Sequence, residues 1–449
     1  MTGAKVTLRS WRRILALGLA AGMAATAIPM QLMAVQETVQ ESQTTGSVTE
    51  GYASERIDNG YTKISAGYAL PEYTGGDIEY PIKDICTSTD AVFTDDYGYT
   101  SAVQIGERGS IELELNVVAD GIYYMCFDYL ADSDTILPVE AQFMIDEMRQ
   151  QVLESQWSTP QQKSYDSYGN EVVGIPDKVY EWQNKYIMDS TYRYSGPLGI
   201  ELTKGRHTVT VTLKEGTLLL GNFKLTAKPQ VEAYTGSEKA AGDGFIEIQA
   251  EDFTYRNASS IHATCEYDPN LYPYQAGNRI MNTVDSTSFS EGGQQISYQF
   301  TVEKEGNYYL AFHYSQSDKS DFPVFMNIRI DGELPNTEFE NCAFAYKKDY
   351  NLYTLLDSEG NKISVPLGAG QHTISMQISM EPLRNALETI EQIMGKVNDL
   401  SLEVTKVAGT EISRWRVIFL ESAIRLYNGQ MNWRQLWKKP ARIIRIRKR

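Results

Sequence analysis

Strand-type alternation of apolar and polar residues dominates the middle of the chain. In HTVTVTL (207–213), Val209, Val211 and Leu213 alternate with threonines, and HTISMQI (372–378) repeats the pattern. A period of two places one set of side chains on a buried face of a sheet and the other set in water. Short strands of this kind, separated by turns without intervening helices, favour an antiparallel β-sandwich. We therefore predict an all-β fold.

One segment follows a helical period instead. Between residues 381 and 397, apolar side chains recur at steps of four and three and form one stripe: Leu383, Leu387, Ile390, Met394 and Val397. Such a stripe predicts an amphipathic helix with one buried face. Two interpretations stay open. The helix lies over the end of a sandwich, or it presents a docking surface to a further domain.

The strand patterns occur twice, in the same order. The paired strands at 110–129 match those at 295–314, and the turns DSYGN (166–170) and DSEGN (357–361) correspond. The two Gly-x-His-Thr strands follow, and each copy is expected to finish with an apolar strand, at 218–228 and at 398–407. Agreement across successive blocks indicates an internal repeat. We predict two tandem sandwiches, at 61–230 and 243–408, the second with the helix inserted.

Within these strands, His207 and His372 each open an alternating run directly after a glycine turn. A single histidine at the start of a strand is seldom a ligand, so we expect a structural role for both. The DSxGN segments combine residues that tolerate or stabilise tight turns.

The two ends of the chain differ from the middle. Residues 1–35 join a basic start to an apolar run that ends in small residues, which is typical of a secretory signal peptide. The run is long enough that a retained membrane anchor is the alternative. Residues 36–60 are polar and form a predicted linker. The basic tail at 410–449 has three interpretations: an interfacial membrane segment, a disordered tail, or the aberrant product of a shifted reading frame.

Charge and motifs narrow the function classes. The net charge is −17, and since 1–35 and 410–449 contribute +4 and +9, the residues between them carry −30. A body this acidic repels nucleic acid. No GxSxG, P-loop or HExxH motif is present, and the four cysteines and four histidines lack metal-site spacing. We predict that the protein is not an enzyme. A glycosidase is the remaining enzyme hypothesis, because carboxylates are abundant.

An aromatic-rich stretch suggests where a ligand could bind. Ligand sites of this kind stack an apolar face of the ligand on an aromatic ring and bind its polar groups with nearby side chains. The segment KVYEWQNKYIMDSTYRY (178–194) has this composition, and the second copy offers tyrosines of its own. The candidate contacts are Trp182, Tyr180, Tyr186, Glu181, Asp189, Tyr350 and Tyr353. The alternative is that these aromatic residues pack a long loop onto the sandwich.

The opening of the second copy, GFIEIQAEDFTYRNAS (244–259), together with the strand pair, the IDGE turn and NDLSLEV, resembles carbohydrate-binding modules of the family-six and family-thirty-five type. These are jelly-roll sandwiches with a galactose-binding-like fold. The two copies together look like the N-terminal part of extracellular solute-binding proteins of ABC-type sugar importers in Gram-positive bacteria. Those proteins continue into a two-lobed solute-binding domain, whereas this sequence changes character soon after Gly409.

This resemblance implies non-catalytic binding of an oligo- or polysaccharide by a secreted or surface-held bacterial protein. The membrane subunits of an ABC importer would be further partners, and the N-terminal segment would mediate any membrane association. The rival hypothesis is a pair of structural modules that space or dock a partner domain without binding sugar.

The same families often hold a structural calcium ion at the sandwich edge. The matching residues are Gln249, Glu251 and Asp399. Calcium prefers several hard, charged oxygen ligands, and Gln249 offers only a neutral carbonyl oxygen. The alternative interpretation is a solvated edge carboxylate.

Overall fold

The computed structural model describes residues 61–408, apart from 146, 161, 237–241, 243 and 318–319. All of these residues belong to one compact unit. The predicted signal peptide, linker and basic tail lie outside the described residues. Within the described part, no helix is both long and apolar enough to cross a membrane.

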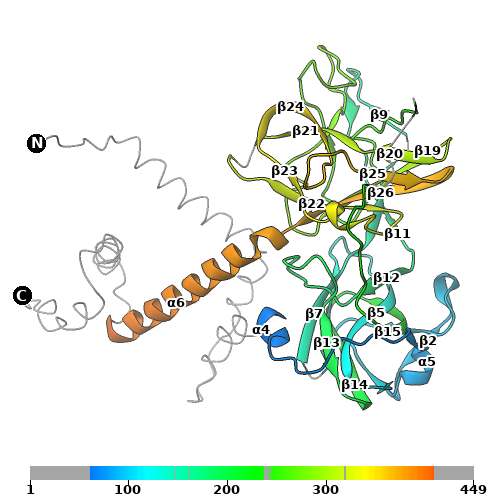
Figure 1. Cartoon of the computed structure of the whole chain (residues 1–449), viewed down its shortest axis with the longest axis vertical. Helices are drawn as coiled ribbons and strands as arrows, with labels where there is room; N and C mark the ends of the chain where they lie inside the picture. The colour runs from blue at the N-terminus through cyan, green and yellow to red at the C-terminus, as the bar shows by residue number, and fades with distance from the viewer. Residues whose placement is uncertain are drawn as a thin grey trace, which may run out of the picture. The chain divides into compact units, whose positions relative to one another are not determined.

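The first sandwich consists of two antiparallel sheets around one core (Figure 1). The larger sheet contains β1 (Ile78–Tyr80), β2 (Val92–Thr94), β3 (Ala102–Ile105), β5 (Gly121–Ala131), β12 (Gln183–Tyr186), β13 (Gly199–Leu202) and β15 (Leu218–Thr226). The smaller sheet runs β4 (Ser110–Val117), β14 (Gly205–Glu215), β6 (Val139–Ile145) and β7 (Glu147–Leu153). Short helical turns precede or link the strands: α4 (Tyr61–Ser65), α5 (Ile82–Ile85) and η1 (Asp96–Gly98). The inward side chains meet at Phe127, whose ring centroid lies 4.8 Å from that of Phe143 and 5.6 Å from that of Phe223.

The second sandwich has one large sheet and several short strand pairs. The large sheet runs β11 (Asp177–Val179), β8 (Gln156–Ser158), β16 (Tyr255–Arg256), β19 (Gln295–Val302), β26 (Gly370–Ser379), β22 (Val324–Ile330) and β23 (Cys342–Phe344). The short pairs are β17 (Ala263–Thr264) with β18 (Thr283–Val284), β20 (Gly306–Tyr309) with β25 (Ser364–Leu367), β21 (Ala311–Gln316) with β24 (Lys347–Thr354), and the outlying β9 (Ser164–Tyr165) with β10 (Glu171–Val172). The 3-10 turn η2 (Thr337–Phe339) contributes the fully buried Phe339 to a core centred on Phe253 and Ile328.

Two strands of this second sheet, β8 and β11, come from the first copy. β8 pairs with β16, so that Trp157 lies opposite Arg256 and is buried. β11 extends the same edge. The first copy therefore contributes backbone to the sheet of the second, and a sharp boundary near residue 230 does not describe this edge.

Strand register confirms the repeat. In the first sandwich Val211 pairs with Ile111 on one side and with Phe143 on the other. In the second, Met376 pairs with Ile296 and Ile328 at the corresponding positions. A one-residue slip would turn every side chain to the opposite face, so the shared register places the same alternating residues in both cores. The prediction of an all-β fold with two tandem sandwiches is confirmed.

The two predicted structural histidines have the same role. His207 Nε2 lies 2.7 Å from the carbonyl oxygen of Thr203, and His372 Nε2 lies 2.9 Å from that of Gly368. Each ring thus closes the glycine turn before its strand. The two DSxGN turns are also alike, since Asp166 accepts from the backbone N–H of Asn170 and Asp357 from that of Asn361.

The inserted helix is present but longer than predicted. After the 3-10 turn η3 (Glu381–Leu383), α6 runs over Arg384–Ala408. The strand predicted at 398–407 is therefore wrong for this structure. The interpretation that the helix lies over a sandwich end is also wrong, because Ile390, Met394 and Val397 of its stripe are exposed. In Figure 1, α6 leaves the second sandwich directly after β26.

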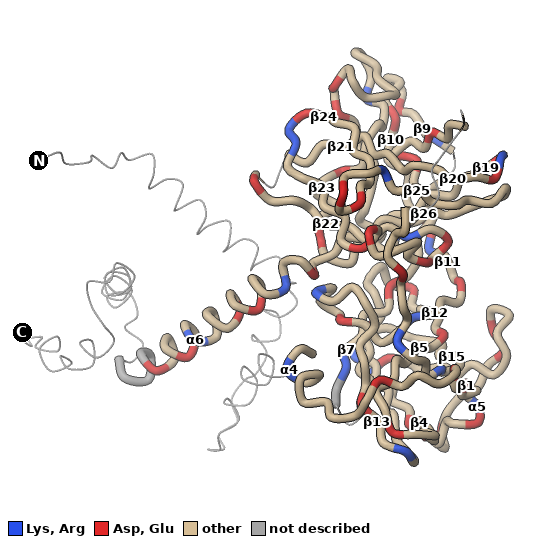
Figure 2. The backbone as a smooth tube through the Cα atoms, in the orientation of Figure 1, with Lys and Arg blue, Asp and Glu red and all other residues tan. Residues whose placement is uncertain are grey.

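Charged residues are spread over both sandwiches. Figure 2 shows acidic segments on each of them and along α6, with basic residues between them. This distribution agrees with the acidic balance of the sequence.

Candidate functional site

Four aromatic residues gather on the outer face of the larger sheet of the first sandwich. Trp182 stacks on Tyr99 with 4.0 Å between ring centroids and an interplanar angle of 30°. Tyr180 stacks on Tyr97 at 5.9 Å and 13°. We call Tyr97, Tyr99, Tyr180 and Trp182 the aromatic platform. Tyr97 and Tyr99 come from the loop around η1, whereas Tyr180 and Trp182 come from the turn that leads into β12.

The aromatic platform covers two leucines on the outer face of the sheet that would otherwise be exposed to solvent. Leu130 and Leu219 alternate with core-facing residues on β5 and β15, so they point away from the core. Both are nevertheless buried, because Tyr99, Tyr180 and Trp182 pack over them. The interpretation that the aromatic stretch packs onto the sandwich thus holds for one side of these rings. The rings are not fully covered, since Tyr99, Tyr180 and Trp182 are half-buried and Tyr97 is 50% exposed.

Carboxylates surround the aromatic rings. The hydroxyl of Tyr99 donates to Asp128 at 2.7 Å, and the amide of Asn184 donates to the other oxygen of Asp128 at 2.7 Å. Tyr97 donates to Asp132 and Tyr180 to Asp134. A carboxylate offers about four lone-pair sites, so each keeps acceptor capacity for further donors.

The phenols of the platform stay neutral over the physiological range. Burial, reinforced by the hydrogen bond to Asp132, raises the pKa of Tyr97 to about 12. Burial also raises the pKa of Tyr99 and of Tyr180. Each hydroxyl is therefore an uncharged donor and acceptor, which suits recognition of a neutral polyol. Within the described structure, the indole Nε1 of Trp182 is buried without a hydrogen-bond partner.

The second sandwich places an aromatic residue at the corresponding position. Gln183 pairs with Tyr129 on β5, and Asn351 pairs with Tyr314 on β21. Since Tyr129 and Tyr314 correspond in the repeat, Trp182 and Tyr350, which precede these partners, correspond as well.

Tyr350 also contacts the segment that follows β17. Its hydroxyl donates to Glu266 at 3.0 Å, and its ring centroid lies 5.4 Å from that of His313. Burial raises the pKa of Tyr350 to about 12. Both sandwiches thus carry an aromatic ring with a nearby carboxylate at this position.

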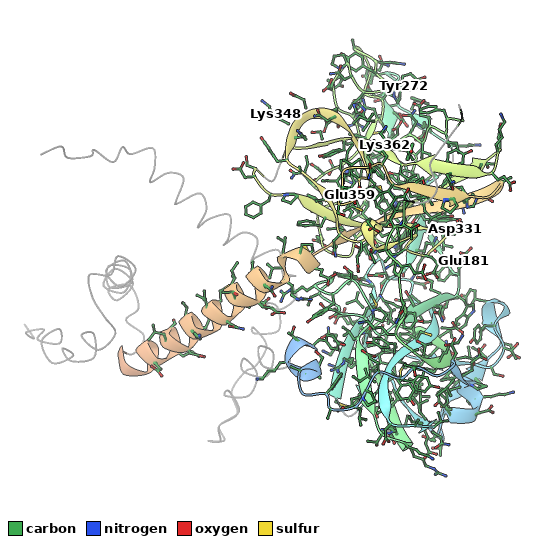
Figure 3. The ribbon with its side chains drawn as sticks, viewed as in Figure 1. Glu181, Tyr272, Asp331, Lys348, Glu359 and Lys362 are labelled. Atoms are coloured by element: carbon green, nitrogen blue, oxygen red, sulfur yellow. The ribbon has the colours of Figure 1, made fainter. Side chains whose placement is uncertain are left out.

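The remaining predicted contacts lie in different environments. Glu181 is exposed beside the platform (Figure 3), and Tyr186 is half-buried on β12 opposite Cys126. Asp189 accepts from the backbone N–H groups of Thr191 and Arg193 and so closes its own loop. Tyr353 packs in the second core, with its ring 5.2 Å from that of Phe344.

Sequence reasoning missed Tyr97, Tyr99 and Asp128. They lie more than fifty positions before Trp182, and the only local signal is the Tyr-Gly-Tyr triplet at 97–99. Their proximity to Trp182 depends on the pairing of β5 with β12, which no local pattern specifies.

The candidate calcium ligands do not form one site in this structure. Asp399 is exposed on α6, and the amide of Gln249 donates to Glu247 at 2.8 Å. Of the three, only Glu251 has buried carboxylate oxygens that are free to bind a cation. Glu251 is 4% exposed, and neither oxygen has a hydrogen-bond partner among the described residues. Burial raises its pKa to about 7. Among the described residues, no three His, Cys, Asp or Glu side chains are grouped to hold a metal ion, and the four cysteines are free.

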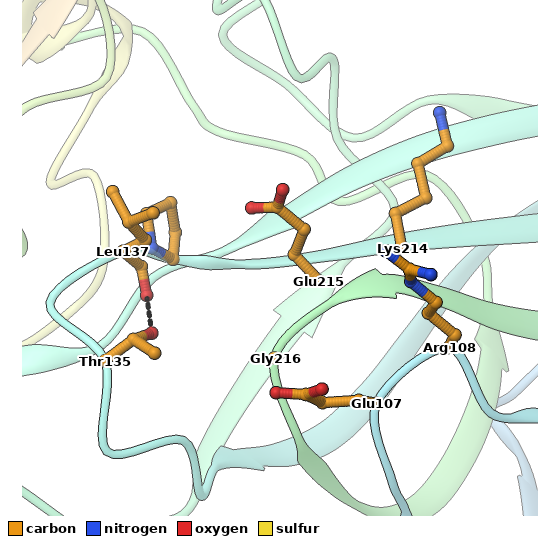
Figure 4. Close-up of a pocket in the computed structure, with 8 residues that line it drawn as sticks. Glu107, Arg108, Thr135, Leu137, Lys214, Glu215 and Gly216 are labelled. Carbon is orange, nitrogen blue, oxygen red and sulfur yellow. Dashed lines mark hydrogen bonds between the residues drawn. The ribbon is translucent and has the colours of Figure 1, made fainter. Parts of the chain in front are cut away.

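A surface hollow of about 250 Å³ lies at the β14–β15 turn (Figure 4). Its lining includes Glu107, Arg108, Lys214 and Glu215, and it contains no aromatic residue. None of the predicted contacts lines it, and charges of both signs without an aromatic face do not suit stacking of a sugar ring.

No protein-family model matches the chain, and no curated protein matches it significantly. Among solved structures, the chain is similar to a β-(1,4)-mannanase of Podospora anserina with GH26 and CBM35 parts, at 12% identity and a TM-score of 0.24, over 37% of this chain and 31% of that one. It is also similar to the C-terminal CBM6 of the laminarinase LamC from Zobellia galactanivorans, at 9% identity and a TM-score of 0.22. This match covers 34% of this chain and 99% of that one. A third similar structure is the CBM35 of Cellvibrio japonicus Abf62, at 10% identity and a TM-score of 0.22. The match covers 34% of this chain and 95% of that one. Similarities of this size support no conclusion about function.

Proposed function

We propose that this protein binds carbohydrate without catalysis, through the outer faces of its two tandem sandwiches. The observation that carries this proposal is the correspondence of Trp182 and Tyr350. Each is an aromatic side chain at the same position of a repeated sheet, and each lies beside a residue that can accept or donate hydrogen bonds.

The chemistry of the first platform fits a neutral sugar. A pyranose has one apolar face of C–H groups, which loses contact with water when it stacks on an aromatic ring. Asp132 and Asp134 lie at the edge of the rings and would accept hydrogen bonds from equatorial hydroxyls, while Glu181 is exposed beside them. Aromatic stacking with a few well-placed polar groups is a usual arrangement for small-ligand sites.

We further propose that binding takes place outside the cytoplasm, at a bacterial surface, in association with ABC-type sugar uptake. This finer proposal is supported by the signal-like residues 1–35 and by the resemblance of the repeat to solute-binding proteins of sugar importers. Two modules on one chain would gain affinity for a polysaccharide through effective concentration, even if each module binds weakly.

A glycan array followed by calorimetry on the full chain tests the core of the proposal. We expect binding to at least one neutral oligosaccharide, and a loss of affinity of about tenfold or more in Trp182→Ala, which corresponds to one stacking interaction. Tyr97→Ala is a second variant with a smaller effect on folding, because Tyr97 is half exposed.

Tyr168→Ala is the matched control. Tyr168 is 84% exposed and lies in the DSYGN turn, outside the platform, so its removal should leave binding unchanged. Equal losses in Tyr168→Ala and Tyr97→Ala would contradict the assignment of the site. The absence of binding to any glycan would contradict the function itself.

The second candidate function is a structural or docking role. One observation favours it: the apolar stripe of α6 is exposed at Ile390, Met394 and Val397. If this is the function, no glycan binds and the platform variants behave like the wild type. A hydrolase would release reducing sugar from a polysaccharide, which the same purified chain can be tested for.

A further inference from the structure

The second sandwich lacks a strand that the first one has. In the first, β15 lies between β5 and β3, with Leu225 opposite Met125 and Leu219 opposite Gln104. In the second, β20 and β21 correspond to β5, and the β17–β18 pair corresponds to β2 and β3. Among the described residues, no strand joins these two groups, and each remains a separate two-stranded piece.

This gap leaves one strand of the second sandwich under-buried. Tyr124 on β5 is 3% exposed, whereas its counterpart Tyr309 is 38% exposed. Cys126 is buried, whereas its counterpart Ala311 is exposed. Phe127 is completely buried, and its counterpart Phe312 is covered only in part. An open edge with apolar side chains and unpaired backbone groups is a site at which a strand can add.

The chain itself carries a sequence that fits the gap. In residues 400–405, Leu400, Leu402 and Val404 alternate with Ser401, Glu403 and Thr405, which is the pattern of a half-buried strand. LEVT (402–405) also matches FKLT (223–226), the part of β15 that pairs with β5. Both segments are the next run with strand-type alternation after the long Gly-x-His-Thr strand.

The second half of α6 is a poor helix by its own sequence. Gly395, Asn398 and Asp399 have low helix propensity and favour helix ends or turns. Leu402 is 60% exposed on this half, so the helical form leaves its apolar side chain in water.

The first half of α6 is instead held in place. Arg193 Nη1 donates to Glu391 at 2.8 Å, and the Arg384 guanidinium lies 4.3 Å from the ring centroid of Tyr194. A fixed first half, followed by Gly395, keeps residues 398–407 tethered to the sandwich that has the open edge, so pairing with this edge would be an intramolecular step favoured by effective concentration.

We propose that residues 398–407 fill this gap as a β-strand of the same chain, antiparallel to β20 and β21, while residues 384–397 remain helical. The register of β15 on β5 defines the pairing. Leu402 lies opposite Phe312, Glu403 opposite Ala311, and Val404 opposite Leu310. Leu402 and Val404 then face the core, as Phe223 and Leu225 do in the first sandwich. The pieces β17–β18 and β21–β24 join into one sheet. This inference is independent of the proposed sugar binding.

A designed disulfide tests the pairing. We expect the full chain carrying Ala311→Cys and Glu403→Cys to form a 311–403 bond under mild oxidation, detected as a linked peptide by mass spectrometry. Ala311→Cys with Gln392→Cys is the control, because Gln392 is exposed on the anchored half of the helix and takes no part in the Arg193–Glu391 pair. Absence of the 311–403 bond would overturn the proposal. A bond found only between two chains would assign the gap to a second copy and would equally overturn it.

A pair of charge substitutions tests burial without a cross-link. Leu402 and Ile393 are 60% and 55% exposed in the helical form, so that form predicts equally small effects of aspartate at either site. If the strand forms, Leu402→Asp puts a carboxylate into the core and lowers the melting temperature by about 5 °C or more, whereas Ile393→Asp does not. Equal melting temperatures for the two variants would overturn the proposal.

Discussion

Tyr99 links three parts of the first sandwich through one hydroxyl. This hydroxyl donates to Asp128 at 2.7 Å and accepts the backbone N–H of Asn222 at 2.8 Å, while its ring supports Trp182. The loop around η1 is thereby fixed to β5 and β15 beneath the aromatic platform. The position of Trp182 thus depends on a residue that lies more than eighty positions earlier in the chain.

We predict that Tyr99→Phe lowers the free energy of unfolding by about 1–2 kcal/mol. The substitution removes the hydroxyl and leaves the Asp128 carboxylate and the backbone N–H of Asn222 without this hydrogen-bond partner. Chemical denaturation measures the effect. Tyr97→Phe is the control, since Tyr97 is 50% exposed and its hydroxyl has one hydrogen bond, to the carboxylate of Asp132, which water can replace. Equal stabilities for the two variants would show that the Tyr99 bonds do not fix the platform.

His372 gives a pH-dependent contribution of known sign. The hydrogen bond to Asp331, 2.6 Å away, raises the pKa of His372 above 6.5 in the folded state. The folded protein therefore binds this proton more tightly than the unfolded chain does. The resulting stabilisation is complete below the unfolded pKa and disappears as the pH rises through the folded pKa.

NMR titration of the imidazole checks this prediction. We expect the pKa of His372 to fall toward its ordinary value in Asp331→Asn. The pH dependence of unfolding above pH 6 should weaken in the same variant. A pKa that is unchanged by Asp331→Asn would refute the role of the ion pair.

The anchoring of α6 is a further testable feature. Arg193 joins Glu391 through two N–H donors, and this ion pair links the helix to the first sandwich. We expect Arg193→Ala to increase amide exchange over residues 384–394, because the first half of the helix loses its anchor. The melting temperature should change little. Lys83→Ala, at an exposed position of α5, is a surface control, and equal exchange rates in the two variants would contradict the anchoring role.

The sequence was informative where the signal was local or repeated. Alternation in the strands at 207–213 and 372–378 predicts the sheet faces, and the order of matching blocks predicts the duplication. The aromatic platform was only half predicted, because Tyr99 and Trp182 meet through strand pairing rather than through proximity in the chain. Residues 398–407 are a case in which a local pattern and the structure disagree. Their alternating pattern predicts a strand, whereas the structure continues the preceding helix through them.

Glu251 provides the last prediction. Both of its carboxylate oxygens lack hydrogen-bond partners among the described residues, and burial raises its pKa to about 7. For an acid with a raised pKa, the folded state holds the proton more tightly than the unfolded chain. Stability is therefore highest below the ordinary glutamate pKa and falls as the pH rises from there to about 7.

Glu251→Gln removes the charge and keeps the shape. We expect this variant to lose that part of the pH dependence and to be more stable than the wild type at pH 8, where the wild-type carboxylate is ionised in a buried position. Thermal unfolding between pH 4 and pH 8 measures both effects. Glu291→Gln is the control, because Glu291 is an exposed glutamate of the same sandwich and does not contribute to the shifted pKa of Glu251. If Glu251→Gln is less stable than the wild type at pH 8, the ionised carboxylate has a partner, and a bound cation such as calcium becomes the favoured explanation because it prefers charged oxygen ligands.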